Sequence, residues 1–119
     1  MYSIQFFMTD HGKKPTEEFL LSLDEKMRVK VLRNMQHLQV HGPRLREPYS
    51  KPLGDGIFEL RTQASGNITR VLYFFYVGHR IVVTHGFIKK TMKTPPQEIE
   101  RAKAYRKNFL EREEKGHRG

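Results

Sequence analysis

Three consecutive strand-like segments, separated by tight turns, constrain the fold of this chain more than any other feature of its sequence. They cover residues 57–62, 69–77 and 80–88, and the turns between them are Ser65-Gly66-Asn67 and Gly78-His79. Connections this short join neighbouring antiparallel strands. The segment over residues 69–77 is the most apolar, so it is predicted to be the central strand. The sequence therefore predicts an antiparallel meander.

Two helices are predicted before the meander. Pro15 suits the first position of a helix, and Ser22-Leu23-Asp24-Glu25 matches a capping box that starts a second, longer helix. Gly42-Pro43 ends the second helix. Its buried face is a stripe of apolar residues at helical spacing: Met27, Val31, Met35 and Leu38. We expect the two helices to form a hairpin that packs on the sheet.

The ends of the chain complete the predicted order of elements, β-α-α-β-β-β-α. A strand is expected over residues 2–8, and residues 43–56 are interpreted as a loop or weak strand. Thr94 is predicted to cap a last helix, with Pro95 at its first position. The predicted fold class is α+β, a helical hairpin packed on a small antiparallel sheet plus a C-terminal helix. We expect one domain over residues 1–110 and a charged, flexible tail over residues 111–119.

The charge of the chain indicates a polyanionic partner. The sequence has 22 Lys and Arg against 13 Asp and Glu, a formal net charge of +9. Such a surplus attracts polyanions, of which nucleic acid is the first candidate, an acidic protein the second and an anionic membrane the third. Basic residues on the long helices, among them Lys30 and Arg33, suit phosphate contacts. The alternatives for these residues are a solvated helix face or the docking of an acidic protein segment that folds on binding.

Several classes of protein are disfavoured by what the sequence lacks. The chain has no cysteine, which excludes disulfides, thiolate metal sites and thiol nucleophiles. Its six histidines lack the spacing of metal ligands. No apolar run reaches the roughly 20 residues that span a bilayer, and residues 1–7 do not resemble a signal peptide. We therefore expect a cytoplasmic protein without a metal, a cofactor or a membrane partner.

Charged residues of the meander form the candidate catalytic site. Strand alternation places Glu59 and Arg61 on one face, Arg70 lies on the next strand, and Lys89 and Lys90 follow the third. Guanidinium and ammonium groups can stabilise the charge that develops on phosphorus during RNA cleavage. We predict that Arg70 and Lys90 do so, with Arg61 in support. The alternative is that Glu59 and Arg61 form only a surface ion pair.

Proton transfer and base stacking are assigned to four residues. Glu59 is the candidate base, because nearby cations would keep its carboxylate ionised. His85 is the candidate acid, since histidine titrates near neutral pH, although its alternation with Phe87 is also compatible with a place in the core. Phe87 and Tyr73 are candidate platforms for an RNA base. The alternative for both rings is the hydrophobic core.

Four short stretches resemble, in the same order, the RelE/HigB superfamily of toxins from toxin–antitoxin systems, and most of all its phage-derived, HigB-like branch. The resemblance covers residues 2–110 and implies a RelE-like fold. The stretches are Gly56-Ile57-Phe58-Glu59-Leu60-Arg61, Arg70-Val71-Leu72-Tyr73-Phe74, His85-Gly86-Phe87-Ile88-Lys89-Lys90-Thr91, and Thr94-Pro95 leading to Glu98-Ile99 and Ala102.

The resemblance implies an endoribonuclease that cleaves mRNA on the ribosome and is silenced by a cognate antitoxin, often a helix-turn-helix protein. Basic residues at the positions of Arg61, Arg70 and Lys89-Lys90 resemble the phosphate-handling groups of the family. Some members use a His or Tyr near the C-terminus as the acid, whereas this chain has no His between Pro95 and His117. The general acid is therefore left open. Two other functions also stay open, a ParE-like inhibitor of DNA gyrase and a basic nucleic-acid-binding module.

Overall fold

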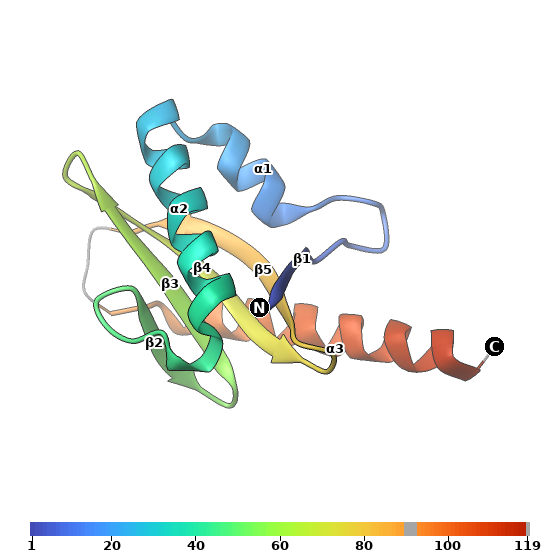
Figure 1. Cartoon of the computed structure of the whole chain (residues 1–119). Helices are drawn as coiled ribbons and strands as arrows, with labels where there is room; N and C mark the ends of the chain where they lie inside the picture. The colour runs from blue at the N-terminus through green and yellow to red at the C-terminus, as the bar shows by residue number, and fades with distance from the viewer. Residues whose placement is uncertain (90–92, 119) are drawn as a thin grey trace.

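The computed structural model describes residues 1–89 and 93–118 of the chain. Figure 1 shows helices α1 and α2 on one face of a sheet and helix α3 on the other. The elements in chain order are β1 (Ser3–Phe6), α1 (Pro15–Ser22), α2 (Glu25–His41), the 3-10 turn η1 (Gly42–Arg44), β2 (Ser50–Gly54), β3 (Ile57–Ala64), β4 (Asn67–Tyr76), β5 (Arg80–Ile88) and α3 (Pro96–Arg118).

The sheet confirms the predicted α+β class and the meander. Within the described residues it has five strands in the order β1-β5-β4-β3-β2. The pairs β3–β4 and β4–β5 are antiparallel, as predicted. Two features differ from the prediction of an antiparallel sheet without β2. Strand β1 pairs with β5 in parallel, so the sheet is mixed, and the region expected to be a loop or weak strand contributes β2 at the edge.

The helical hairpin forms where the sequence predicts it, but the cap of its second helix differs. The carboxylate of Asp24 accepts a hydrogen bond of 2.8 Å from the backbone N–H of Met27, so Asp24 is the N-cap of α2. The hydroxyl of Ser22 instead donates to the carbonyl of Phe19 at the end of α1. The capping box was therefore placed two residues too early, because Ser22 and Asp24 are both good cap residues.

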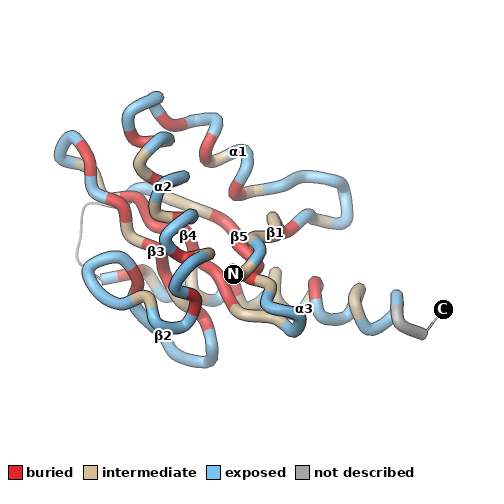
Figure 2. The backbone as a smooth tube through the Cα atoms, viewed as in Figure 1, coloured by how far each residue is buried: buried red, intermediate tan, exposed pale blue. Residues whose placement is uncertain are grey.

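Two hydrophobic cores lie on the two faces of the sheet. Figure 2 shows that many of the buried positions lie along the central strands. The predicted stripe of α2 is buried and packs on Leu60, Val71 and Val83. On the other face Leu72 and Phe74 pack with residues of α3. The central strand β4 alternates between the two cores, which explains why its sequence is almost continuously apolar.

Helix α3 starts over the sheet and continues past it toward the C-terminus (Figure 1). Up to Arg118 it is helical, so it includes most of the segment for which a flexible tail was predicted. That flexibility, like the domain boundary at residue 110, stays a prediction. None of the helices in the described ranges is long and apolar enough to cross a membrane.

Candidate functional site

The strand register brings most of the predicted site residues together on the sheet face toward α3. Arg61 of β3 lies opposite Arg70 of β4, and Arg70 lies opposite Phe87 of β5. Glu59 and His85 occupy the next row across the same strands. Directly opposite residues, and residues two apart on one strand, share a face of the sheet. The meander therefore brings Glu59, Arg61 and Arg70 to one face, together with His85 and Phe87, whereas Lys90, which was also expected there, lies outside the described residues.

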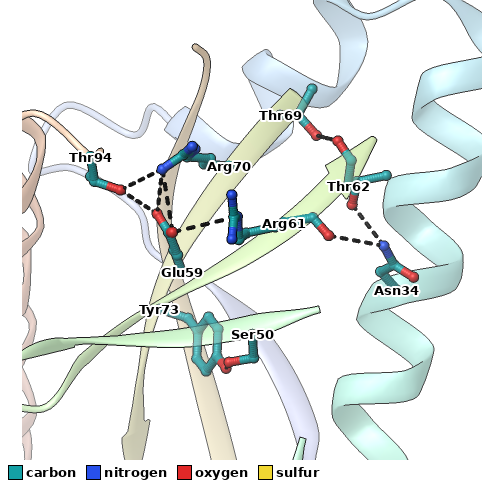
Figure 3. A network of polar contacts seen from close by, with 9 residues as sticks. All are labelled: Asn34, Ser50, Glu59, Arg61, Thr62, Thr69, Arg70, Tyr73 and Thr94. Carbon is teal, nitrogen blue, oxygen red and sulfur yellow. Dashed lines mark hydrogen bonds and ion pairs between the residues drawn. The ribbon is translucent and has the colours of Figure 1, made fainter. Parts of the chain in front are cut away.

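A buried ion pair lies at the centre of this face. The Nη1 atom of Arg70 is 3.3 Å from both carboxylate oxygens of Glu59, and the two side chains are 0% and 1% exposed. The hydroxyl of Thr94 accepts a hydrogen bond of 2.9 Å from Arg70 and donates one to Glu59 (Figure 3). A buried charge is costly unless it is paired and hydrogen-bonded, and here each charge has such partners. Neither Arg70 nor Glu59 is therefore accessible to a phosphate or a ribose in this structure.

Arg61 is the second guanidinium beside the same carboxylate. Its Nε atom is 3.7 Å from Oε1 of Glu59, and its side chain is 18% exposed, so it reaches solvent where Arg70 does not. Its backbone N–H donates to the carbonyl of Tyr49 at 2.8 Å, which fixes this part of β3. The alternative of a simple surface pair between Glu59 and Arg61 is wrong, because Glu59 is buried. Arg61 is a partly exposed cation beside a buried anion.

His85 lies in a closed environment on the same face. It is 2% exposed, its Nδ1 atom is 3.1 Å from the hydroxyl of Thr84, and its Nε2 atom is 3.3 Å from a carboxylate oxygen of Glu98. Burial lowers the pKa of His85, the Glu98 carboxylate opposes this shift, and Arg101 adds to it. This environment disfavours the imidazolium that a general acid requires. The ring of Phe87, half-buried, stacks on His85 with a centroid distance of 6.0 Å.

Tyr73 lies on the opposite face of the sheet, away from the other candidates. It is 1% exposed, its ring stacks on Phe58, and its hydroxyl is hydrogen-bonded to Ser50. Burial raises the pKa of Tyr73 to about 12, so the phenol stays neutral. A ring enclosed in the core is not available to an RNA base. The prediction that Tyr73 stacks on substrate is therefore wrong for this structure, and the alternative of a core residue is correct.

Of the two predicted lysines, the structure describes one. Lys89 continues the line of β5, since its backbone N–H donates to the carbonyl of Ile68 at 3.1 Å. Strand alternation would place its side chain on the same face as Phe87. Lys90 lies outside the described residues, so its predicted role in stabilising the transition state stays a prediction. The predicted neighbourhood of Arg61 and Arg70 is observed, but Arg70 is inside the protein.

A basic groove adjoins Arg61 at the outer edge of β3. It has a volume of about 400 Å³ and lies between α2 and β3. Its lining includes Lys30, Arg33 and His37 of α2, Tyr49 before β2, and Arg61, and none of the described residues that line it is acidic. Sequence reasoning named Lys30 and Arg33 as possible phosphate contacts, but it missed the groove. Only the packing of α2 against the edge of β3 creates it.

Sequence reasoning also missed two partners of the predicted residues. Thr94 was interpreted as a helix cap, but α3 starts at Pro96 and the Thr94 hydroxyl binds Arg70 and Glu59. No contact was predicted for Glu98, whereas its carboxylate lies within hydrogen-bond distance of His85. The signal for Thr94 was its place in the last of the four family-like stretches. Among the described residues, no group of three His, Asp or Glu side chains is arranged to hold a metal ion.

A helical hairpin and a single helix on opposite faces of a small sheet, with arginines gathered on the central strands, define a RelE-like class of protein. Residues 18–107 match the family model described as phage-derived protein Gp49-like (DUF891), so the chain belongs to that family. It is a RelE/HigB-like family of toxins. None of the curated proteins matches the chain.

Proposed function

We propose that this protein is the toxin of a type II toxin–antitoxin system, of the HigB-like branch, and that it cleaves mRNA on the ribosome. Membership of a RelE/HigB-like toxin family supports the proposal, as does the net charge of +9. The observation that carries it is the position of Arg61. Its guanidinium is held 3.7 Å from the buried Glu59 carboxylate, and Arg61 is also one of the residues that line the open basic groove. A cation fixed in this way is suited to a phosphate whose charge increases during reaction.

The proposed reaction is an attack by the 2′-OH of one ribose on the adjacent phosphorus. The new bond joins O2′ to phosphorus, the bond from phosphorus to O5′ breaks, and the products are a cyclic phosphate and a 5′-hydroxyl. The proton leaves O2′ and a proton is delivered to O5′, without a metal ion. In this proposal Arg61 stabilises the negative charge of the transition state, and Lys89 contributes to the local positive field.

The buried pair has a positioning role in this proposal. Glu59 already accepts hydrogen bonds from Arg70 and Thr94, so it holds Arg61 in place and is not the base that removes the 2′ proton. Arg70 keeps that carboxylate ionised and oriented. These roles replace the direct contacts with RNA that were predicted for Glu59 and Arg70.

The proposal includes two partners and a location. The substrate is mRNA on the ribosome, and the inhibitor is a cognate antitoxin, a helix-turn-helix protein. Both imply that the toxin acts in the cytoplasm. The support for the antitoxin is the toxin family to which the chain belongs, since such toxins are kept inactive by a co-expressed partner.

Mapping of RNA 5′ ends after induced expression tests the proposal. We expect growth arrest, and new 5′ ends inside translated reading frames. A reporter mRNA whose start codon is destroyed should stay intact, because cleavage requires a translating ribosome. Intact transcripts together with a DNA-damage response would replace the proposal with inhibition of gyrase. Expression without any effect on growth would favour a basic binding module.

A further inference from the structure

The groove between α2 and the outer edge of β3 carries a further inference. We propose that it binds one nucleotide of a single-stranded RNA, with the phosphate on its cationic wall and the base against Tyr49 and His37. This site lies beside the proposed reacting phosphate, so the inference rests on the proposed function and deepens it by naming a second point of contact with the RNA substrate.

The groove exists because strand β2 is shorter than β3. The pairing of β2 with β3 reaches Leu60, and beyond it the outer edge of β3 faces α2. The side-chain amide of Asn34 donates to the carbonyl of Arg61 at 3.3 Å and to the hydroxyl of Thr62 at 2.9 Å (Figure 3). These bonds hold the helix and the strand at a fixed separation. The space of about 400 Å³ that remains falls within the range of small-ligand sites, roughly 300–1,000 Å³.

The charge of the groove selects an anion. Lys30, Arg33 and Arg61 line it, and no acidic residue occurs among the described lining residues. The ammonium of Lys30 has three donors, and the carbonyl of Gln63 takes one of them at 3.4 Å. Lys30 can therefore also donate to a phosphate, next to the guanidinium of Arg33. Lysine and arginine side chains make many of the contacts that proteins form with phosphodiesters.

The aromatic rings of the groove select a nucleic acid with accessible bases. Tyr49 is 45% exposed, and its ring lies 5.9 Å from the ring of His37 at an angle of 32°. Its backbone is fixed, because its carbonyl accepts a hydrogen bond from Arg61 and its N–H donates to Arg46. Exposed rings beside cations are typical of sites for single-stranded RNA, whose bases can stack on them. A duplex hides its bases, and an acidic peptide needs no ring, so single-stranded RNA fits best.

Binding of a labelled oligonucleotide of about ten nucleotides, within the range of single-stranded sites, tests the inference by fluorescence anisotropy. The oligonucleotide carries 2′-O-methyl groups, which prevent cleavage and separate binding from catalysis. We expect Tyr49→Ala to weaken binding by about tenfold, as for loss of one stacked base. Tyr49→Phe should bind like the natural protein, because it keeps the ring. With an abasic oligonucleotide, Tyr49→Ala and the natural protein should bind equally.

A charge reversal tests the cationic wall. Arg33→Glu should weaken binding. It should also reduce the steepness of log affinity against log salt concentration by about one, as expected for the loss of one phosphate contact. Lys107→Glu is the matched control, because it makes the same change of net charge at an exposed position of α3. We expect a clearly smaller effect from it. Circular dichroism and thermal unfolding of each variant verify that the exposed substitutions leave the fold intact.

Three results would overturn the inference. They are equal affinities of Tyr49→Ala and the natural protein, equal losses from Arg33→Glu and Lys107→Glu, or displacement of the RNA by poly-glutamate as effective as by unlabelled RNA. The last result would indicate an acidic protein as the occupant. If one of these three results is found and RNA is still cleaved in cells, only the inference about the groove is refuted, and the proposed function is retained. If binding depends on Tyr49 and Arg33 but no RNA is cleaved in cells, the proposed function is refuted and the inference that the groove binds RNA is retained.

Discussion

The guanidinium of Arg70 and the carboxylate of Glu59 form an ion pair inside the protein, with the Nη1 atom at equal distances of 3.3 Å from both oxygens. The two residues come from adjacent strands, and Thr94 joins them from the segment before α3. The pair thus connects two strands of the sheet to the start of the last helix. Arg61, on the solvent side of the same carboxylate, depends on this arrangement for its position.

Removal of one member of the buried pair should destabilise the fold. We expect Arg70→Ala to lower the free energy of unfolding by about 3–5 kcal/mol, because it leaves the Glu59 carboxylate buried without its main partner. Urea unfolding measures this loss. Arg44→Ala, at an exposed position, should change stability by less than about 0.5 kcal/mol.

An apolar replacement of both members separates stability from function. The double variant Glu59→Leu/Arg70→Met should recover most of the stability lost in Arg70→Ala, since no buried charge is left unpaired. It should nevertheless stay inactive in the 5′-end assay, because Arg61 has lost its anchor. Full RNA cleavage by a stable double variant would contradict the positioning role of the pair.

Arg61→Ala should strongly reduce activity and leave the fold nearly unchanged. The Arg61 side chain is partly exposed, and without it the buried Glu59 still has its bonds from Arg70 and Thr94, so we expect the loss of stability to be clearly smaller than for Arg70→Ala. Loss of a transition-state contact, in contrast, should reduce mRNA cleavage at least about tenfold. The measurement is the frequency of new 5′ ends at equal protein levels, with Arg44→Ala as the control. Undiminished growth arrest in Arg61→Ala would remove Arg61 from the reaction.

His85 should make the fold sensitive to mild acid. Its pKa is lowered in the folded protein, so between the unfolded pKa of about 6.5 and the lower folded pKa the unfolded chain binds more protons. Stability is then complete above about pH 6.5 and decreases as the pH falls, by at most about 1.4 kcal/mol per pH unit from this group. Urea unfolding at pH 7.5 and at lower pH measures the loss.

The histidine is identified by comparison of two variants. His85→Gln should show a smaller loss of stability on acidification than the natural protein. His11→Gln, at an exposed position, should retain the full loss. If His85→Gln and the natural protein respond equally to acid, other groups cause the sensitivity.

Tyr73→Phe should affect stability and leave RNA binding unchanged. The substitution removes the hydroxyl that pairs with the buried Ser50, which costs about 1–3 kcal/mol because one polar group is left without its partner. Chemical unfolding and the anisotropy assay measure the two quantities. Ser50→Ala should give a loss of similar size. Weaker RNA binding by Tyr73→Phe would restore the rejected role of this residue at the substrate.

Most of the fold could be predicted from local sequence patterns. Helix α2 carries an apolar stripe of regular period, and short turns force β3, β4 and β5 into a meander. Strand β2 was harder to recognise, because Lys51 and Pro52 have low strand propensity and the strand exists only by pairing with β3. The parallel pairing of β1 with β5 joins residues such as Ser3 and Arg80, and no short-range pattern encodes a contact so distant in sequence.

The sequence could predict which face of the sheet carries the candidate site, but not how deeply the residues of that site are buried. Alternation along the strands is enough to place Glu59 and Arg61 together, and the meander places Arg70 beside them. Burial depends on what covers the face, and the cover comes from Thr94 and the start of α3, far along the chain. For this reason the sequence predicted Arg70 as a contact of the phosphate, whereas the structure encloses it.

The hydrogen bonds that α2 makes to the edge of β3 also affect how the protein can associate. Side chains of Asn34 and Lys30 already engage the carbonyls of Arg61 and Gln63 on this edge. An extended peptide needs such carbonyls to add itself to a sheet as an extra strand. These bonds therefore hinder strand addition at this edge, and a partner that binds in that way is expected to use another edge of the sheet.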